Sequence, residues 1–206
     1  MKSPLSYQAS EYDCGPTTML NSISYLFHRR EIPPDVIKHI MLYCLDSYNI
    51  KGEFGKSGTS GIAMMFLSNW LNQFGRVKKF PICCEFLTRE DVQITQNSKI
   101  VSSLQQGGAV VVKLVLGGWH YVLLTGAESN SISLFDPYYR KKDFGIKGIV
   151  MVSDKPSKMN RLVDFGILNS PEKGIYSLGP VETREAVVLF NKNTRKTPDN
   201  SIEYFI

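Results

Sequence analysis

Three apolar runs rich in β-branched residues lie close together in the middle of the chain, at residues 109–116, 119–125 and 132–136. A glycine pair, Gly117-Gly118, separates the first two runs, and polar residues 128–130 separate the second from the third. Short apolar runs bounded by turn residues are typical of buried strands. We therefore predict a meander of antiparallel strands over residues 109–136.

The residues before this meander have a helical pattern of apolar side chains. The first predicted helix opens at Pro16, and the second follows Pro33-Pro34, with Val36, Ile40 and Met41 expected on one face. The third follows a Gly/Ser-rich loop in which Thr59 or Ser60 can cap it. Its expected apolar residues are Ile62, Met65, Phe66, Leu67, Trp70 and Leu71. Further strands are expected at residues 80–86, 148–152, 161–165 and 186–190, and a short helix at residues 98–106. Helices followed by a sheet predict an α+β fold.

Composition excludes several classes of protein. The chain has 206 residues, of which 43% are hydrophobic and 21% charged, as in ordinary globular domains. Its net charge of +5 is spread along the chain, whereas a nucleic-acid-binding face needs a denser basic stripe. No apolar run approaches the roughly 18 residues of a membrane span, and residues 1–10 lack the apolar core of a secretory signal. We expect a cytoplasmic protein that binds no nucleic acid, while the oligomeric state is not indicated.

Four cysteines stand at positions 14, 44, 83 and 84, and none belongs to a Cys-x-x-Cys motif. The chain has only three histidines to complete a zinc site, so we expect no metal and no cofactor. Cys44, Cys83 and Cys84 fit buried thiols that act as small apolar residues.

Cys14 differs from the other cysteines because Gly15 and Pro16 follow it. Proline suits the first turn of a helix, so Cys14 is expected at or just before a helix N-terminus. The positive potential there favours a reactive thiolate. A lone cysteine at a helix start is nevertheless more often structural than catalytic.

His120 and Asp136 are the candidate partners of Cys14. His120 begins an apolar run just after the glycine pair, and Asp136 ends the next run before a proline. A hairpin that turns around residues 126–131 would bring the two side chains close together. Asp136 could then orient His120, and His120 could exchange a proton with Cys14. Taken singly, His120 could equally be a core histidine and Asp136 a turn residue.

These residues also carry a family resemblance. Gln8, five further residues and Cys14-Gly15, followed by His120-Tyr-Val and Asp136-Pro, resemble the bacteriocin-processing cysteine peptidases, the C-thirty-nine peptidase family, and their stand-alone relatives. The resemblance covers roughly residues 5–145. It implies a papain-like fold in which N-terminal helices pack on an antiparallel sheet. It also implies that Gln8 donates to the oxyanion hole, a role for which an amide NH2 is suited.

The resemblance implies a cysteine peptidase or amide hydrolase that acts on a peptide or amide-containing substrate through an acyl-enzyme. An acyltransferase using the same site, or a non-catalytic peptide-binding module, are the alternatives. The phosphate-binding loop of an ATPase is missing, so cleavage after a double glycine is not implied. We expect residues 1–147 to form the catalytic domain and residues 148–206 a C-terminal extension of the same domain.

Overall fold

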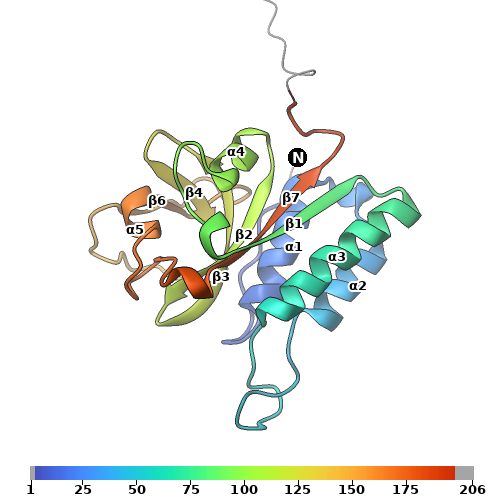
Figure 1. The fold of residues 1–206 in the computed structure, drawn as a ribbon, viewed down its shortest axis with the longest axis horizontal. Helices are drawn as coiled ribbons and strands as arrows, with labels where there is room; N and C mark the ends of the chain where they lie inside the picture. The colour runs from blue at the N-terminus through green and yellow to red at the C-terminus, as the bar shows by residue number, and fades with distance from the viewer. Residues whose placement is uncertain (1–2, 198–206) are drawn as a thin grey trace, which may run out of the picture.

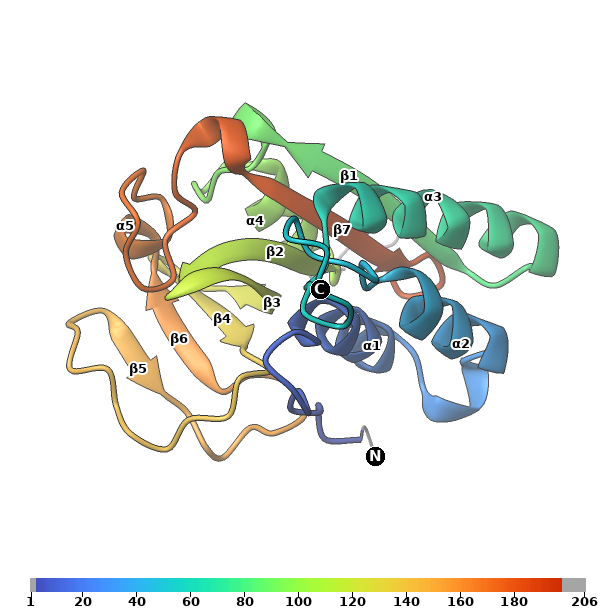
Figure 2. The same ribbon diagram turned by 90° about the horizontal axis from the view of Figure 1, so that it is seen from below.

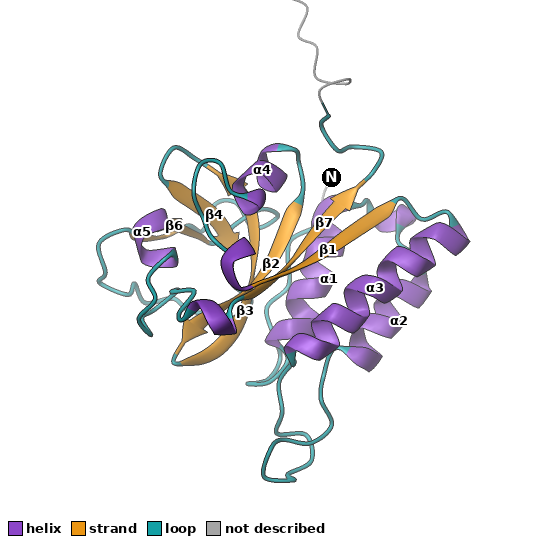
Figure 3. Cartoon of the chain, in the orientation of Figure 1, coloured by secondary structure: helices purple, strands orange, loops and turns teal. Residues whose placement is uncertain are grey.

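A seven-stranded antiparallel sheet forms the centre of the molecule (Figures 1 and 3). The computed structural model describes residues 3–197. The predicted meander is confirmed as β2 (Ala109–Leu116), β3 (Gly118–Ala127) and β4 (Ser131–Phe135). The strand order across the sheet is β1-β7-β2-β3-β4-β6-β5. The chain is therefore α+β with an antiparallel sheet, as its order of elements predicts.

The last strands of the chain belong to this same sheet. β7 (Glu185–Asn191) lies between β1 (Ile82–Thr88) and β2, and β6 (Arg161–Asp164) pairs with both β4 and β5 (Ile149–Met151). Residues on both sides of position 147 thus share one hydrogen-bonded sheet. The boundary expected there divides strands that are neighbours in space.

Helices cover both faces of the sheet (Figure 2). α1 (Cys14–Leu26), α2 (Pro34–Tyr43) and α3 (Gly61–Lys78) pack on one face, and α4 (Lys99–Gln105) and α5 (Phe165–Leu168) lie on the other. Side chains alternate between the faces along each strand. In β7, for example, Val187 and Leu189 join the core under α1, whereas Val188 and Phe190 join the opposite core.

The apolar faces predicted for the second and third helices are partly wrong. Met41 in α2 is 52% exposed, because α2 buries only one narrow line of side chains, Val36 and Ile40, which continues to Cys44 just after the helix. In α3, Ile62, Met65 and Phe66 are likewise exposed, whereas Leu67 and Leu71 are buried as predicted, beside Met64 and Gly75. Ser60 caps α3 as predicted, since its Oγ accepts a hydrogen bond from the N–H of Ala63 at 3.2 Å. Within residues 3–197, no helix is long and apolar enough to cross a bilayer.

A β-bulge in β3 determines which residues of the β3–β4 hairpin share a face. Near the turn Gly126 pairs with Ser133, but beyond the bulge Leu124 pairs with Leu134, so Thr125 has no opposite residue. A shift of one residue moves side chains to the other face of a sheet. With the bulge, residues 120 and 136 lie on the same face; without it they would lie on opposite faces. Thr125 is held there by its Oγ1, which donates to the carbonyl of Ser133 at 3.2 Å.

Gly75 offers a test of how closely α3 packs on β1. A Cβ at Gly75 would lie 2.8 Å from the carbonyl oxygen of Phe80 and 3.0 Å from Cγ2 of Ile82. We expect Gly75→Ala to lower the free energy of unfolding in urea by about 1–2 kcal/mol, because overpacking outweighs the gain in helix propensity. Gly166→Ala in α5 is the matched control, since no atom lies within 4 Å of its added Cβ. Equal stability of the two variants would contradict the close packing of α3.

Candidate active site

Cys14 is the first residue of α1, as its sequence context predicts. The helix is fixed to the sheet close to this end, because the hydroxyl of Thr18 donates to the carbonyl oxygen of Tyr121 in β3 at 3.0 Å. Gly15 lies against Thr59, whose Oγ1 would be only 1.9 Å from an added Cβ. The Cys14 side chain is largely buried but reaches two surface clefts. Its position on the molecule is therefore set by both β3 and the loop before α3.

His120 and Asp136 meet in the structure. His120 lies near the start of β3, Asp136 follows directly after β4, and the bulged register places both on one face of the sheet. Nε2 of His120 lies 2.7 Å from Oδ1 of Asp136. Both side chains are buried, so this interaction is shielded from water. The structure thus brings together the two side chains that the sequence places on neighbouring strands.

Both carboxylate oxygens of Asp136 accept hydrogen bonds from groups other than His120. Oδ1 also accepts the backbone N–H of Tyr138 at 2.7 Å, and Oδ2 accepts the hydroxyl of Tyr176 at 2.5 Å. The backbone of Asp136 pairs with the side chain of Asn160, which accepts its N–H at 2.8 Å and donates to its carbonyl at 2.7 Å. The carboxylate is thus fixed in position by its hydrogen bonds.

The protonation of His120 follows from these contacts. Burial alone lowers the pKa of the imidazole, but hydrogen bonds to Asp136 and Cys14, together with their negative charges, outweigh it and raise the pKa to about 9. His120 is therefore an imidazolium at neutral pH. Because Nε2 is bound to Asp136, Nδ1 is the ring nitrogen left for Cys14.

Gln8 lies beside Cys14, where the sequence places an oxyanion donor. It lines the same cleft as Cys14 and His120, and its backbone N–H donates to the carbonyl of Pro137 at 2.9 Å. Its side-chain Nε2 donates one hydrogen to the carbonyl of Ser10 at 2.7 Å. A carboxamide nitrogen carries two hydrogens, so one donor remains. The oxyanion role of Gln8 stays a prediction.

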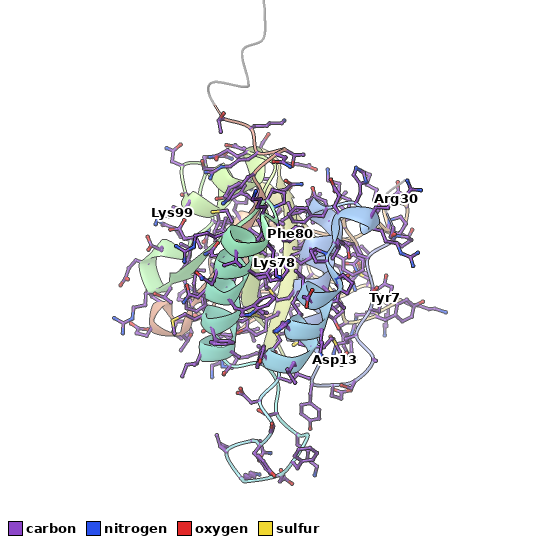
Figure 4. All side chains as sticks on the ribbon, turned by 90° about the vertical axis from the view of Figure 1, so that its right-hand side faces the viewer. Tyr7, Asp13, Arg30, Lys78, Phe80 and Lys99 are labelled. Atoms are coloured by element: carbon purple, nitrogen blue, oxygen red, sulfur yellow. The ribbon has the colours of Figure 1, made fainter. Side chains whose placement is uncertain are left out.

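Asp13 organises the loop that carries Gln8. Its carboxylate accepts the backbone N–H groups of Ala9 at 2.9 Å and Ser10 at 2.6 Å, and the hydroxyl of Ser10 at 2.6 Å. Burial tends to raise the pKa of Asp13, but these hydrogen bonds outweigh it and lower the pKa. Figure 4 labels Asp13 at the end of α1, where the loop enters the helix. Asp13 therefore connects the position of Gln8 to that of Cys14.

Two clefts meet at Cys14. One, of about 500 Å³, lies towards His120, Tyr138 and Arg140, and the other, of about 420 Å³, lies towards the loop at residues 57–60. Trp119 is 43% exposed and lines both clefts, with Nζ of Lys113 5.0 Å from the centre of its ring. A peptide bound across Cys14 could therefore contact both clefts.

Cys44 and Cys84 are buried, as the sequence predicts. Cys83, which the sequence also predicts to be buried, is only half-buried. Burial raises the pKa of Cys44 to about 12, and it raises that of Cys84 as well. Among residues 3–197, no group of three or more histidine, cysteine, aspartate or glutamate side chains is arranged to hold a metal ion.

Sequence reasoning missed three residues around Asp136: Asn160, Arg161 and Tyr176. They lie between 24 and 40 positions further along the chain and belong to the expected extension. Arg161 lies in a strand that the sequence predicts, but no motif marks any of the three as a site residue, because their contacts depend on the pairing of β4 with β6 and on the path of the chain after α5. Only the fold brings them to the site.

The pKa of His120 can be tested directly by NMR titration of its ring resonances. We expect a midpoint near pH 9 in the native chain. In Asp136→Asn the midpoint should fall to or below the ordinary value of about 6.5, because burial then acts with less opposing negative charge. His28→Gln and His39→Gln identify the remaining two ring signals. A midpoint that is the same in the native chain and in Asp136→Asn would contradict the coupling.

No family model matches the chain, and no curated protein matches its sequence. The functional argument therefore rests on the geometry of Cys14, His120, Asp136 and Gln8.

Proposed function

We propose that the chain is a cysteine peptidase or amide hydrolase with a papain-like fold, related to the bacteriocin-processing cysteine peptidases. The observation that carries the proposal is the convergence of Cys14 from α1 and His120 from β3 at one cleft, with Asp136, just after β4, buried 2.7 Å behind Nε2 of His120. The raised pKa of His120 adds to it, because an imidazolium beside Cys14 stabilises a thiolate. A structural histidine needs neither a buried carboxylate partner nor a neighbouring thiol.

In the proposed reaction, Sγ of Cys14 attacks the carbonyl carbon of an amide. As the carbon–nitrogen bond breaks, Nδ1 of His120 gives its proton to the leaving nitrogen, and a thioester remains on Cys14. Water then attacks the thioester, and His120 takes a proton from it. The carbon–sulfur bond breaks, which releases a carboxylic acid and restores the thiolate–imidazolium pair.

Negative charge develops on the substrate oxygen during the attack, and hydrogen-bond donors near the start of α1 must stabilise it. The backbone N–H of Cys14 belongs to the first turn, where amide groups have no partner within the helix. The second hydrogen of Gln8 Nε2 is the other donor we assign. Asp13 supports this arrangement, because it fixes the loop that carries Gln8.

The two clefts support a peptide substrate that extends on both sides of the bond that is cleaved. Cys14 and Trp119 line both hollows, so a bound chain would cross the nucleophile rather than end at it. A cleft that held only a small amide would need a hollow on one side alone. The cytoplasmic location expected from the sequence stays a prediction.

Iodoacetamide labelling tests the nucleophile. We expect Cys14 to be alkylated at least about tenfold faster than Cys44 at neutral pH, because the raised pKa and burial of Cys44 keep its thiol protonated. His120→Ala should slow the labelling of Cys14 and leave that of Cys83 unchanged. The sites are read by mass spectrometry of proteolytic fragments. Equal labelling of all four thiols would contradict the assignment of Cys14 as the nucleophile.

Cleavage of a peptide library tests the reaction and the role of Gln8. We expect cleaved products from the native chain and none from Cys14→Ala. Gln8→Ala should reduce the turnover of the best peptide by about 10²–10³-fold, as the loss of an oxyanion donor does, with little change in iodoacetamide labelling. Gln73→Ala, the same change at an exposed residue of α3 that lines neither cleft, is the control. Products joined to an added amine, with no hydrolysis, would assign an acyltransferase instead.

A further inference from the structure

A buried arginine lies behind the carboxylate that holds His120. Arg161 in β6 pairs with Leu134 in β4, so its side chain lies on the same face of the sheet as Asp136. Its Nε donates to the hydroxyl of Tyr176 at 3.2 Å, and that hydroxyl donates to Oδ2 of Asp136 at 2.5 Å. Tyr176 thus connects a buried cation to the carboxylate.

Besides Tyr176, the guanidinium of Arg161 has few partners, one of which is the ring of Phe144, whose centre lies 6.0 Å from the guanidinium carbon. The residue is 2% exposed, its NH1 donates to the carbonyl of Asn160 at 2.8 Å, and its NH2 is buried without a partner. Within residues 3–197, none of the ion pairs involves Arg161. A buried cation is costly unless a negative charge stabilises it. Asp136, through Tyr176, is the anion this arrangement provides.

Tyr176 is held in an unusual backbone conformation at this position. Its φ is +63°, in the left-handed region that a tyrosine seldom adopts. Its N–H donates to the carbonyl of Val115 in β2 at 2.7 Å, and the N–H of Val115 donates to the carbonyl of Ser177 at 2.9 Å. These bonds to a central strand fix the hydroxyl against Asp136.

We propose that Tyr176, supported by Arg161, takes up part of the negative charge of Asp136 and so keeps His120 able to release its proton during catalysis. Both are positioning residues that act on substrate only through Asp136 and His120. The proposal rests on the function proposed above, because it concerns the proton that His120 gives to the leaving nitrogen.

A buried carboxylate can hold an imidazolium so firmly that the imidazolium does not release its proton. Without water, hydrogen bonds and charges act strongly, so a carboxylate with no other donor would bind the His120 proton tightly. A general acid works best when its pKa lies near the working pH. The hydroxyl of Tyr176 competes with His120 for the charge of the carboxylate, and Arg161 makes that hydroxyl a better donor.

Tyr176→Phe separates this role from a structural one. We expect the NMR midpoint of His120 to rise by about half to one pH unit, a three- to tenfold gain in proton affinity. Turnover of the best library peptide should fall about tenfold or more. Iodoacetamide labelling of Cys14 should be unchanged or faster, since alkylation needs the thiolate and no proton from His120. A structural role would reduce labelling and turnover together. Tyr43→Phe on α2 is the matched control.

A second variant keeps the size and the hydrogen bond of the tyrosine. A ring-fluorinated tyrosine incorporated at Tyr176 is a stronger donor, so the midpoint of His120 should move in the opposite direction, downwards. This variant also serves if Tyr176→Phe does not fold. An unchanged midpoint in the fluorinated protein, or a lower one in folded Tyr176→Phe, would overturn the proposal. Failure of the function proposed above gives a different result: Cys14 would show no preferential labelling and no peptide would be cleaved, while the midpoint would still respond to Tyr176.

Discussion

The register of the β3–β4 hairpin is the constraint on which the site depends. The extra residue Thr125 shifts the pairing by one position, and that shift puts His120 and Asp136 on the same face of the sheet. The hydroxyl of Tyr25 in α1 donates to the carbonyl of Thr125 at 2.9 Å, so the helix that begins with Cys14 also contacts the bulge. Cys14, His120 and Asp136 are therefore all tied to one local feature of the sheet.

Residues after position 147 complete the surroundings of Asp136 and the sheet that carries His120. Asn160 fixes the backbone of Asp136, and Tyr176 occupies its second carboxylate oxygen. β7 passes between β1 and β2, so the sheet that presents His120 is not whole without residues 185–191. These contacts explain why the site is not confined to residues 5–145, although the recognisable motifs are.

Much of the fold follows from local patterns in the sequence. Gly117-Gly118 and the apolar runs beside it predict β2 and β3 closely, and Ser60 marks the start of α3. The side of a helix that faces the core is harder to predict, as Ile62 shows, because α3 has apolar residues on more than one side and the sheet selects among them. Cys14, His120 and Asp136 could be chosen because each stands at the start or end of an apolar segment. Tyr176 could not, because its role depends on a contact across 40 positions of the chain.

The central proposal is that Cys14 is the nucleophile and that the imidazolium of His120 stabilises its thiolate. The ultraviolet absorbance of the thiolate measures this directly, as a difference between the native chain and Cys14→Ala at neutral pH. The account predicts a difference that corresponds to about one thiolate per chain, and its loss in His120→Ala. Identical spectra for the native chain and Cys14→Ala would contradict it.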